Sequence, residues 1–236
     1  MSRPTVTPLV FPERVETERL RLDRLTRDRL HPLDGYEVWG ASRSPTIEEE
    51  TRYTLFEPHE TPNDSREFLA EAASAFDDAE AATYAVLPTT DDPGDADVEP
   101  RVDGLPFAGT AGLHVEWDRR RADLGIHLRR PFWGRGYSGE RAAALLDLAF
   151  DRLDLDVVVV SHLPENEASR RAVERYVDRF GGRRAGRLRN EVVDATGDVH
   201  DVVRYSIAAD EWRAAVADDR PAVRYPDVDD PGADRY

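Results

Sequence analysis

A glycine-rich turn between an alternating strand and an amphipathic helix is the first feature of this sequence that could do chemistry. The turn contains Gly134, Gly136 and Gly139, and the helical pattern after it runs through Leu153. The first N–H groups of a helix have no partner within the helix, and the positive end of its dipole favours an anion. Glycines let a ligand approach the main chain, so the sequence predicts a phosphate-binding turn here.

The strand that precedes the turn contains a second feature that could do chemistry. Leu124, Ile126 and Leu128 share one face of this strand, whereas Asp123 and His127 lie on the other. Asp123 is therefore a charged residue on the side away from the apolar core, shortly before a phosphate-binding turn. That position makes Asp123 a candidate catalytic residue.

The surrounding pattern predicts the elements that must position these residues. Strands are expected at 18–25, 83–87, 107–117, 122–128, 157–160, 184–188 and 202–207. Helices are expected before Trp39, over 68–76, after 137, over 164–177 and over 209–217, and residues 41–64 are interpreted as loop. This order indicates an α/β fold with a mixed sheet. We predict an extended arm (1–15), one domain (16–217) with an acidic loop insertion (89–104), and an acidic tail (218–236) that is poorly ordered from about residue 220.

Composition narrows the class of protein. The chain of 236 residues has 48 acidic and 32 basic residues, a formal net charge of −16, no cysteine and no lysine. Nucleic-acid binders normally have the opposite charge, and without cysteine neither disulfides nor thiol catalysis is available. The lysine-free acidic surface is typical of proteins from salt-loving microbes. No apolar run reaches membrane-spanning length and the six histidines lack metal-ligand spacing, so we expect a cytoplasmic, soluble protein without a metal.

Several motifs in matching order resemble one family. They are Arg19-Leu-Arg-Leu-Asp-Arg-Leu25, Phe107-Ala-Gly-Thr-Ala-Gly-Leu113, Ala122-Asp-Leu-Gly-Ile126, Phe132-Trp-Gly-Arg-Gly-Tyr137 with Glu140, Asn166-Glu-Ala-Ser-Arg-Arg171 and Gly186-Arg-Leu-Arg189. Together they resemble the GNAT superfamily of N-acetyltransferases, above all its ribosomal-protein N-terminal acetyltransferase branch. The resemblance covers about residues 16–213. It implies a mostly antiparallel sheet of about seven strands, splayed at two central parallel strands, here 123–128 and 157–161.

The resemblance also implies roles for individual residues. The pantetheine arm of acetyl-CoA would lie in the gap between the splayed strands, and the loop 133–138 would give amides to the pyrophosphate. Asp123 matches the acid that often serves as the base, and Ser169 matches a hydroxyl proposed to protonate the leaving sulfur. Asn166 is a helix N-cap by its residue type and a cofactor contact by resemblance. The implied cofactor-binding residues are His127, Leu128, Arg130, Trp133, Gly134, Arg135, Gly136, Tyr137, Ser138 and Asn166.

Three features qualify these assignments. Many family members carry a general-acid Tyr where this chain has Val173, and Tyr176 one turn later is interpreted as a core residue. Pro131 replaces the basic or Gln residue that often precedes the loop, so Arg130 or Arg135 would have to supply that charge. Arginines 119–121, 129, 130 and 135 form a basic island suited to a polyphosphate, although those at 119–121 could equally be solvated side chains on a turn.

The sequence therefore predicts an acetyl-CoA-dependent N-acetyltransferase that transfers the acetyl group directly to a primary amine. The acceptor is a protein N-terminus or a small molecule, and the protein is a monomer or homodimer that uses neither nucleic acid nor membrane. The alternative is a non-catalytic acyl-CoA-binding sensor of the same fold. The segment 134–139 also spells G-x-G-x-x-G, but a dinucleotide-binding enzyme is disfavoured because Arg129–Trp133 separates the strand from the first glycine.

Overall fold

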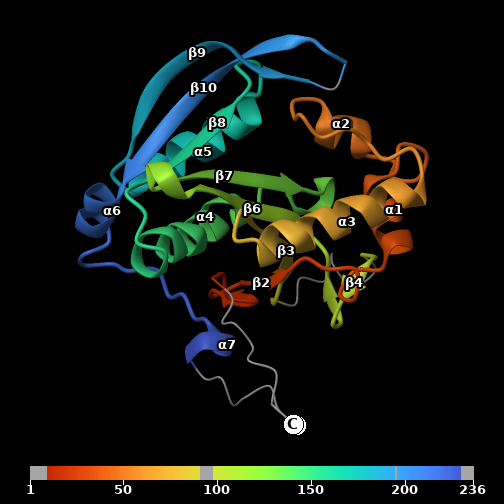
Figure 1. Cartoon of the computed structure of the whole chain (residues 1–236), viewed down its shortest axis with the longest axis horizontal. Helices are drawn as coiled ribbons and strands as arrows, with labels where there is room; N and C mark the ends of the chain where they lie inside the picture. Colours follow the sequence, from red (N-terminus) through yellow and green to blue (C-terminus); the bar gives the residue numbers. More distant parts are fainter. Residues whose placement is uncertain (1–9, 91–97, 195, 230–236) are drawn as a thin grey trace.

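Eight strands form one mixed sheet in the computed structural model, which describes residues 10–90, 98–194 and 196–229 (Figure 1). The strand order is β1-β2-β3-β6-β7-β8-β10-β9, and only the neighbours β7 and β8 are parallel. The predicted α/β class and mostly antiparallel sheet are confirmed. The strands are β1 (Arg14–Glu16), β2 (Leu20–Arg24), β3 (Ala81–Pro88), β6 (Gly109–Glu116), β7 (Arg121–Leu128), β8 (Val157–His162), β9 (Arg183–Val193) and β10 (Val199–Ala208), with a separate hairpin of β4 (Arg101–Val102) and β5 (Leu105–Pro106).

In the eight-stranded sheet, the strand that the sequence did not predict is β1. It pairs with β2 in a register that sets Arg14 opposite Asp23, within a segment where prolines favoured an extended arm. Three residues are too few to show an alternating pattern, so this strand is recognised only by its pairing with β2. The small hairpin of β4 and β5 lies at the end of the predicted acidic insertion, of which residues 91–97 lie outside the described residues.

Helices cover both faces of the sheet. Side chains of β3 alternate between two apolar clusters: Tyr84 and Val86 pack with the α4 residue Leu145, whereas Leu87 packs with the α3 residue Leu69. Among the described residues, no helix has the length and apolar character needed to cross a bilayer. The helices are α1 (Pro32–Trp39), α2 (Ile47–Thr51), α3 (Pro62–Asp77), α4 (Tyr137–Asp147, continued by a π-helical turn at Leu148–Arg152), α5 (Glu167–Arg179), α6 (Ala209–Ala215) and α7 (Pro226–Asp229).

The two parallel strands pair over only three positions. Arg121, Ala122 and Asp123 of β7 lie in register with residues 157–159 of β8, and the pairing then ends. Beyond Asp123, β7 remains paired with β6 on its other side, and the rest of β8 remains paired with β10. The splay implied by the family resemblance is therefore present, and it begins at the predicted catalytic residue.

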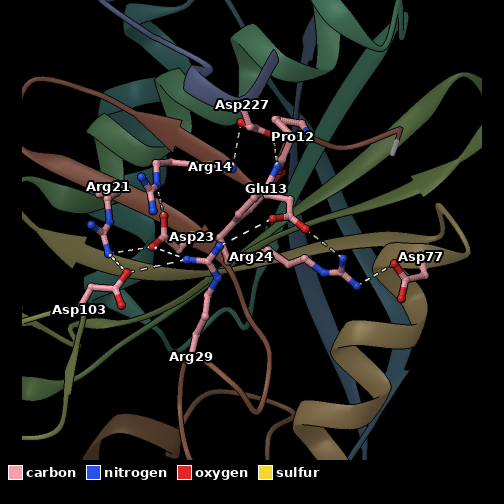
Figure 2. Close-up of polar contacts among 11 residues, drawn as sticks. Pro12, Glu13, Arg14, Arg21, Asp23, Arg24, Arg29, Asp77, Asp103 and Asp227 are labelled. Atoms are coloured by element: carbon pink, nitrogen blue, oxygen red, sulfur yellow. Dashed lines mark hydrogen bonds and ion pairs between the residues drawn. The ribbon is translucent and has the colours of Figure 1, made fainter. Parts of the chain in front are cut away.

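A buried carboxylate holds the outer strands together. The Asp23 side chain is fully buried on β2 and contacts three guanidinium groups, from Arg14 (2.9 Å), Arg21 (2.9 Å) and Arg29 (3.1 Å), as Figure 2 shows. Beside this cluster, the Asp227 carboxylate of α7 accepts a hydrogen bond from the Glu13 amide at 2.7 Å. Charges from segments far apart in the chain thus fix β1 between β2 and the C-terminal helix.

The C-terminal segment packs against the domain as far as residue 229. Arg224 exchanges two main-chain hydrogen bonds of 2.9 Å with Glu16 of β1. Tyr225 is 3% exposed, and its hydroxyl donates to the Asp147 carboxylate of α4 at 2.7 Å. The interpretation of this segment as poorly ordered is therefore wrong for residues 220–229, because a free edge of β1 and a buried carboxylate offer it partners. Residues 230–236 lie outside the described part of the chain.

Candidate active site

The glycine turn has the backbone geometry that an anion-binding loop requires. Gly134 and Gly136 have φ angles of 77° and 82°, in the left-handed region where L side chains are strained. Gly136 is the N-cap of α4, so the N–H groups of Tyr137 and Ser138 belong to the unpaired first turn of the helix. A Cβ atom placed on Gly134 would meet no atom within 4 Å. The loop is therefore open to a ligand that uses its main chain.

Contacts from the β1–β2 turn to this loop offset the negative charge of Glu140. Glu140 lies in the first turn of α4, where its carboxylate would repel a phosphate. One carboxylate oxygen accepts from the Thr17 hydroxyl (2.6 Å) and the Arg19 amide (2.8 Å), and the other accepts from the Arg19 guanidinium (2.8 Å). Arg19 also donates to the Arg135 carbonyl at 3.1 Å. Arg19 thus offsets the charge of Glu140 and fixes the loop.

A pocket of about 750 Å³ opens beside the loop, which is a size typical of small-molecule sites. It runs between α4 and α5 and is bounded by the β1–β2 turn and by residues 221–223. Arg171, Arg175 and Arg179 line it at a spacing of four, which sets them on one face of α5. Sequence reasoning missed this arginine face, although the spacing was its signal. Of the predicted residues, the lining includes Leu128, Trp133, Gly134, Gly136, Tyr137 and Ser138.

His127 lies outside the pocket lining, against the helix α2 that the sequence analysis had interpreted as loop. Its ring stacks on Phe56 with a centroid separation of 5.7 Å, and Nε2 lies 3.7 Å from a Glu50 carboxylate oxygen. Burial lowers the pKa of His127, which favours the neutral imidazole. The strand alternation that sets Leu128 in the pocket turns the neighbouring His127 toward the other face of the sheet.

Arg130 and Arg135 both belong to the loop but lie outside the pocket lining. The Arg130 amide donates to the buried Glu50 carboxylate at 2.7 Å, and its guanidinium pairs with Glu49 at 3.1 Å. The Arg135 guanidinium lies over the Phe132 ring at 5.2 Å. These contacts tie the start of the loop to α2 and to the core.

Asp123 lies where β7 and β8 separate, and Ser169 lies in the helix that follows β8; neither residue is among those that line the pocket. Asp123 is the last paired residue of β7, its side chain is 41% exposed, and its Oδ2 is 3.6 Å from the Arg121 guanidinium. Burial raises the pKa of Asp123, and Arg121 and Arg204 oppose that shift. Ser169 lies in the first turn of α5, where its amide donates to the Asn166 side chain at 2.9 Å. The N-cap assignment of Asn166 is therefore confirmed.

The arginines of the predicted basic island lie at opposite ends of β7. Arg119–Arg121 lie at the β6–β7 turn, and the glycine loop follows the other end of β7, about 23 Å away at the usual rise of a strand. Arg119 and Arg121 pair with Glu116, and Arg120 pairs with Asp156 at 2.9 Å. For these three arginines the interpretation as turn side chains holds, and they do not reach the loop.

No general-acid tyrosine stands at the position where family members often carry one. Val173 is 5% exposed and belongs to the apolar core. Tyr176 is 2% exposed and belongs to the apolar core, as interpreted, but it also lines the pocket, with its ring 5.8 Å from the Arg141 guanidinium. Burial raises the pKa of Tyr176.

Comparison with known proteins agrees with this fold and site. The Acetyltransferase (GNAT) domain matches residues 19–176, and the chain belongs to that family. The "Putative ribosomal N-acetyltransferase YdaF" of Bacillus subtilis is 30% identical over 107 residues, which are 45% of this chain and 56% of that protein. The chain thus spans about half the length of the curated relatives it matches.

Solved structures share the architecture. A GCN5-related N-acetyltransferase from Brucella melitensis has a TM-score of 0.65 at 22% identity, covering 88% of this chain and 84% of that one. The microcin C7 self-immunity acetyltransferase MccE, solved in complex with acetyl-CoA and AMP, has a TM-score of 0.65 at 14% identity, covering 81% of this chain and 93% of that one. At these identities the likeness concerns the fold.

Proposed function

We propose that this protein is an acetyl-CoA-dependent N-acetyltransferase that transfers the acetyl group directly to a primary amine. The observation that carries the proposal is the pocket between the glycine turn and the arginine face of α5, adjoining the splay of β7 and β8. Membership in the GNAT acetyltransferase family and the acetyl-CoA complex of MccE support the choice of donor.

The residues of the pocket fit the chemistry of the donor. Amides of Tyr137 and Ser138 at the start of α4 suit the pyrophosphate, which carries negative charge without needing a side-chain partner. Arg171 and Arg175 provide further positive charge on the facing helix. The splay leaves main-chain groups of β7 beyond Asp123 without partners on the β8 side, and these suit the amide-containing pantetheine arm. Bound acetyl-CoA would supply the activated thioester.

Transfer requires that the attacking amine lose a proton and that the leaving sulfur gain one. In this proposal Asp123 accepts the proton of the amine, directly or through one water, at the point where the strands separate. Its raised pKa makes the carboxylate a stronger base than an ordinary Asp. Ser169 donates a proton to the sulfur in place of the tyrosine that many family members use. The amine nitrogen bonds to the acetyl carbon as the carbon–sulfur bond breaks.

The acceptor in this proposal is the N-terminus of a protein. The name of the Bacillus subtilis relative supports a ribosomal substrate, as does the resemblance of this sequence to the ribosomal-protein N-terminal acetyltransferase branch. The segment between α1 and α3, which includes α2 and Phe56, lies on the sheet face opposite the pocket and would meet the acceptor.

Calorimetric titration with acetyl-CoA in molar KCl tests the donor. The test variant is Gly134→Asp, which sets a carboxylate in the loop. Gly104→Asp is a matched control, because Gly104 has a φ of 79°, has the same open surroundings and lies in the β4–β5 turn. We expect wild type and Gly104→Asp to bind and Gly134→Asp to lose binding. Equal binding by all three proteins would contradict the proposed site.

Turnover separates the enzyme from the alternative, a sensor that binds acyl-CoA without reaction. The observation that favours the sensor is the buried Val173 at the position where many family members carry the general-acid tyrosine. An acetylation assay with peptides that begin with Ser or Ala, and with polyamines as small-molecule acceptors, decides between them. Release of free CoA thiol that depends on acceptor and falls in Asp123→Ala supports the enzyme.

A further inference from the structure

We infer that the C-terminal segment Pro221-Ala222-Val223 is the wall against which the purine base of the donor nucleotide packs. This inference rests on the proposed function and adds to it a binding element that lies outside the matched GNAT domain, which ends at residue 176. It identifies the adenosine end of the cofactor as the part that this segment recognises.

The pocket extends from the glycine turn to this C-terminal segment. The lining residues of α5 extend from Ala168 to Arg179, a length of about 16 Å along the helix axis. Leu128 marks the side of the splay, where a thioester arm would lie, and residues 221–223 form a wall of the remaining groove. A ligand whose pyrophosphate lies on the glycine turn would therefore direct its nucleotide into the space that 221–223 encloses.

The two long walls of the groove differ in chemistry. The α5 wall contains Arg171, Arg175 and Arg179, of which Arg179 already pairs with Asp219, whereas the C-terminal wall contains Pro221, Ala222 and Val223. An apolar wall facing a cationic one suits a group that is aromatic on one side and anionic on the other. A purine nucleoside with a phosphate on its ribose has this character, because its base can pack on apolar side chains while its phosphate meets arginine.

The wall is held in place by contacts on both sides of it. Before it, Arg220 donates to the Asp147 carboxylate of α4 at 2.7 Å, and Asp219 lies 3.5 Å from the Arg179 guanidinium across the groove. After it, the buried Tyr225 donates to the same Asp147. A segment anchored at both ends is already ordered, so a ligand would not have to order it on binding.

The test is the binding of donor fragments to a variant of the wall. Ala222 is exposed and lines the groove, so Ala222→Glu adds bulk and charge there without disturbing the core. Ala217→Glu makes the same change at another exposed alanine, outside the pocket lining. Calorimetry in molar KCl, where repulsion is screened within about 3 Å, would measure acetyl-CoA, acetyl-dephospho-CoA and S-acetyl-4′-phosphopantetheine. Thermal melting of both variants would verify the fold.

We expect Ala222→Glu to raise the dissociation constant at least ten-fold for acetyl-CoA and equally for its dephospho form. The phosphopantetheine, which lacks the nucleoside, should bind as it does to wild type, and Ala217→Glu should bind all three like wild type. Unchanged acetyl-CoA binding by Ala222→Glu would overturn the inference, as would an equal loss for the phosphopantetheine. Failure of wild type to bind acetyl-CoA would instead overturn the proposed function, and the inference with it.

Discussion

Replacing Asp23 by Asn should strongly destabilise the fold, because three arginines share this one buried carboxylate. The side chains of Arg14, Arg21 and Arg29 are only 22%, 15% and 26% exposed, and that of Asp23 is completely buried. The substitution keeps the shape of the side chain but replaces one acceptor oxygen with an NH₂ donor. The arginines would then lose a negative charge while remaining largely shielded from water.

The size of the loss follows from the burial and from the remaining partners. Removing one member of a buried ion pair typically costs about 3–5 kcal/mol. Asp103 still lies 2.8 Å from the Arg21 guanidinium, so we expect the lower end, about 3 kcal/mol. For a domain of this size that corresponds to a melting temperature lower by about 6–12 °C.

Urea denaturation followed by circular dichroism would measure the change, with Glu37→Gln as the control. Glu37 pairs with Arg43, but both side chains are about half exposed, at 49% and 51%. Such surface pairs are worth about 0–1 kcal/mol, so the control should barely change the midpoint. If Asp23→Asn cost less than about 1 kcal/mol, the burial argument would be refuted and the cluster would behave as a surface pair.

Three further predictions concern the site and its support. Arg19→Gln should weaken acetyl-CoA binding about five- to ten-fold by calorimetry, since Glu140 would lose its counter-charge. The second substitution Glu140→Gln should then restore most of the affinity. An absence of recovery in the double variant would contradict the charge argument. If Asp123 is the base, kcat/KM should rise with pH through a pKa above that of an ordinary Asp and then level off, and the Asp123→Asn pH profile should lack this limb. Tyr225→Phe should cost about 1.5–3 kcal/mol of unfolding free energy, because its hydroxyl donates to a buried carboxylate of α4; a thermal melt identical to wild type would show that this bond is not stabilising.

The local sequence pattern was enough to predict the strand and the turn that position the site. The alternation of Leu124, Ile126 and Leu128 predicted β7 to within one residue of its observed bounds, and the glycines predicted the turn that starts α4. Both signals depend only on the backbone period and on glycine conformation, which act within a few residues. Leu128 and the turn residues Trp133, Gly134, Gly136, Tyr137 and Ser138, which these local signals placed, line the pocket.

The direction and partners of individual side chains were decided by tertiary structure. The sequence carried no sign that Arg19 would pair with Glu140, 121 residues away, or that residues 221–223 would wall the pocket. His127 was expected beside Leu128 at the cofactor, but the sheet turns it toward Glu50 on a helix interpreted as loop. The sequence by itself thus determined the family, most of the elements and the glycine turn, since these follow from local spacing. Only the tertiary structure decided which distant charges neutralise one another and which segments enclose the pocket, because those contacts depend on how the sheet brings remote parts of the chain together.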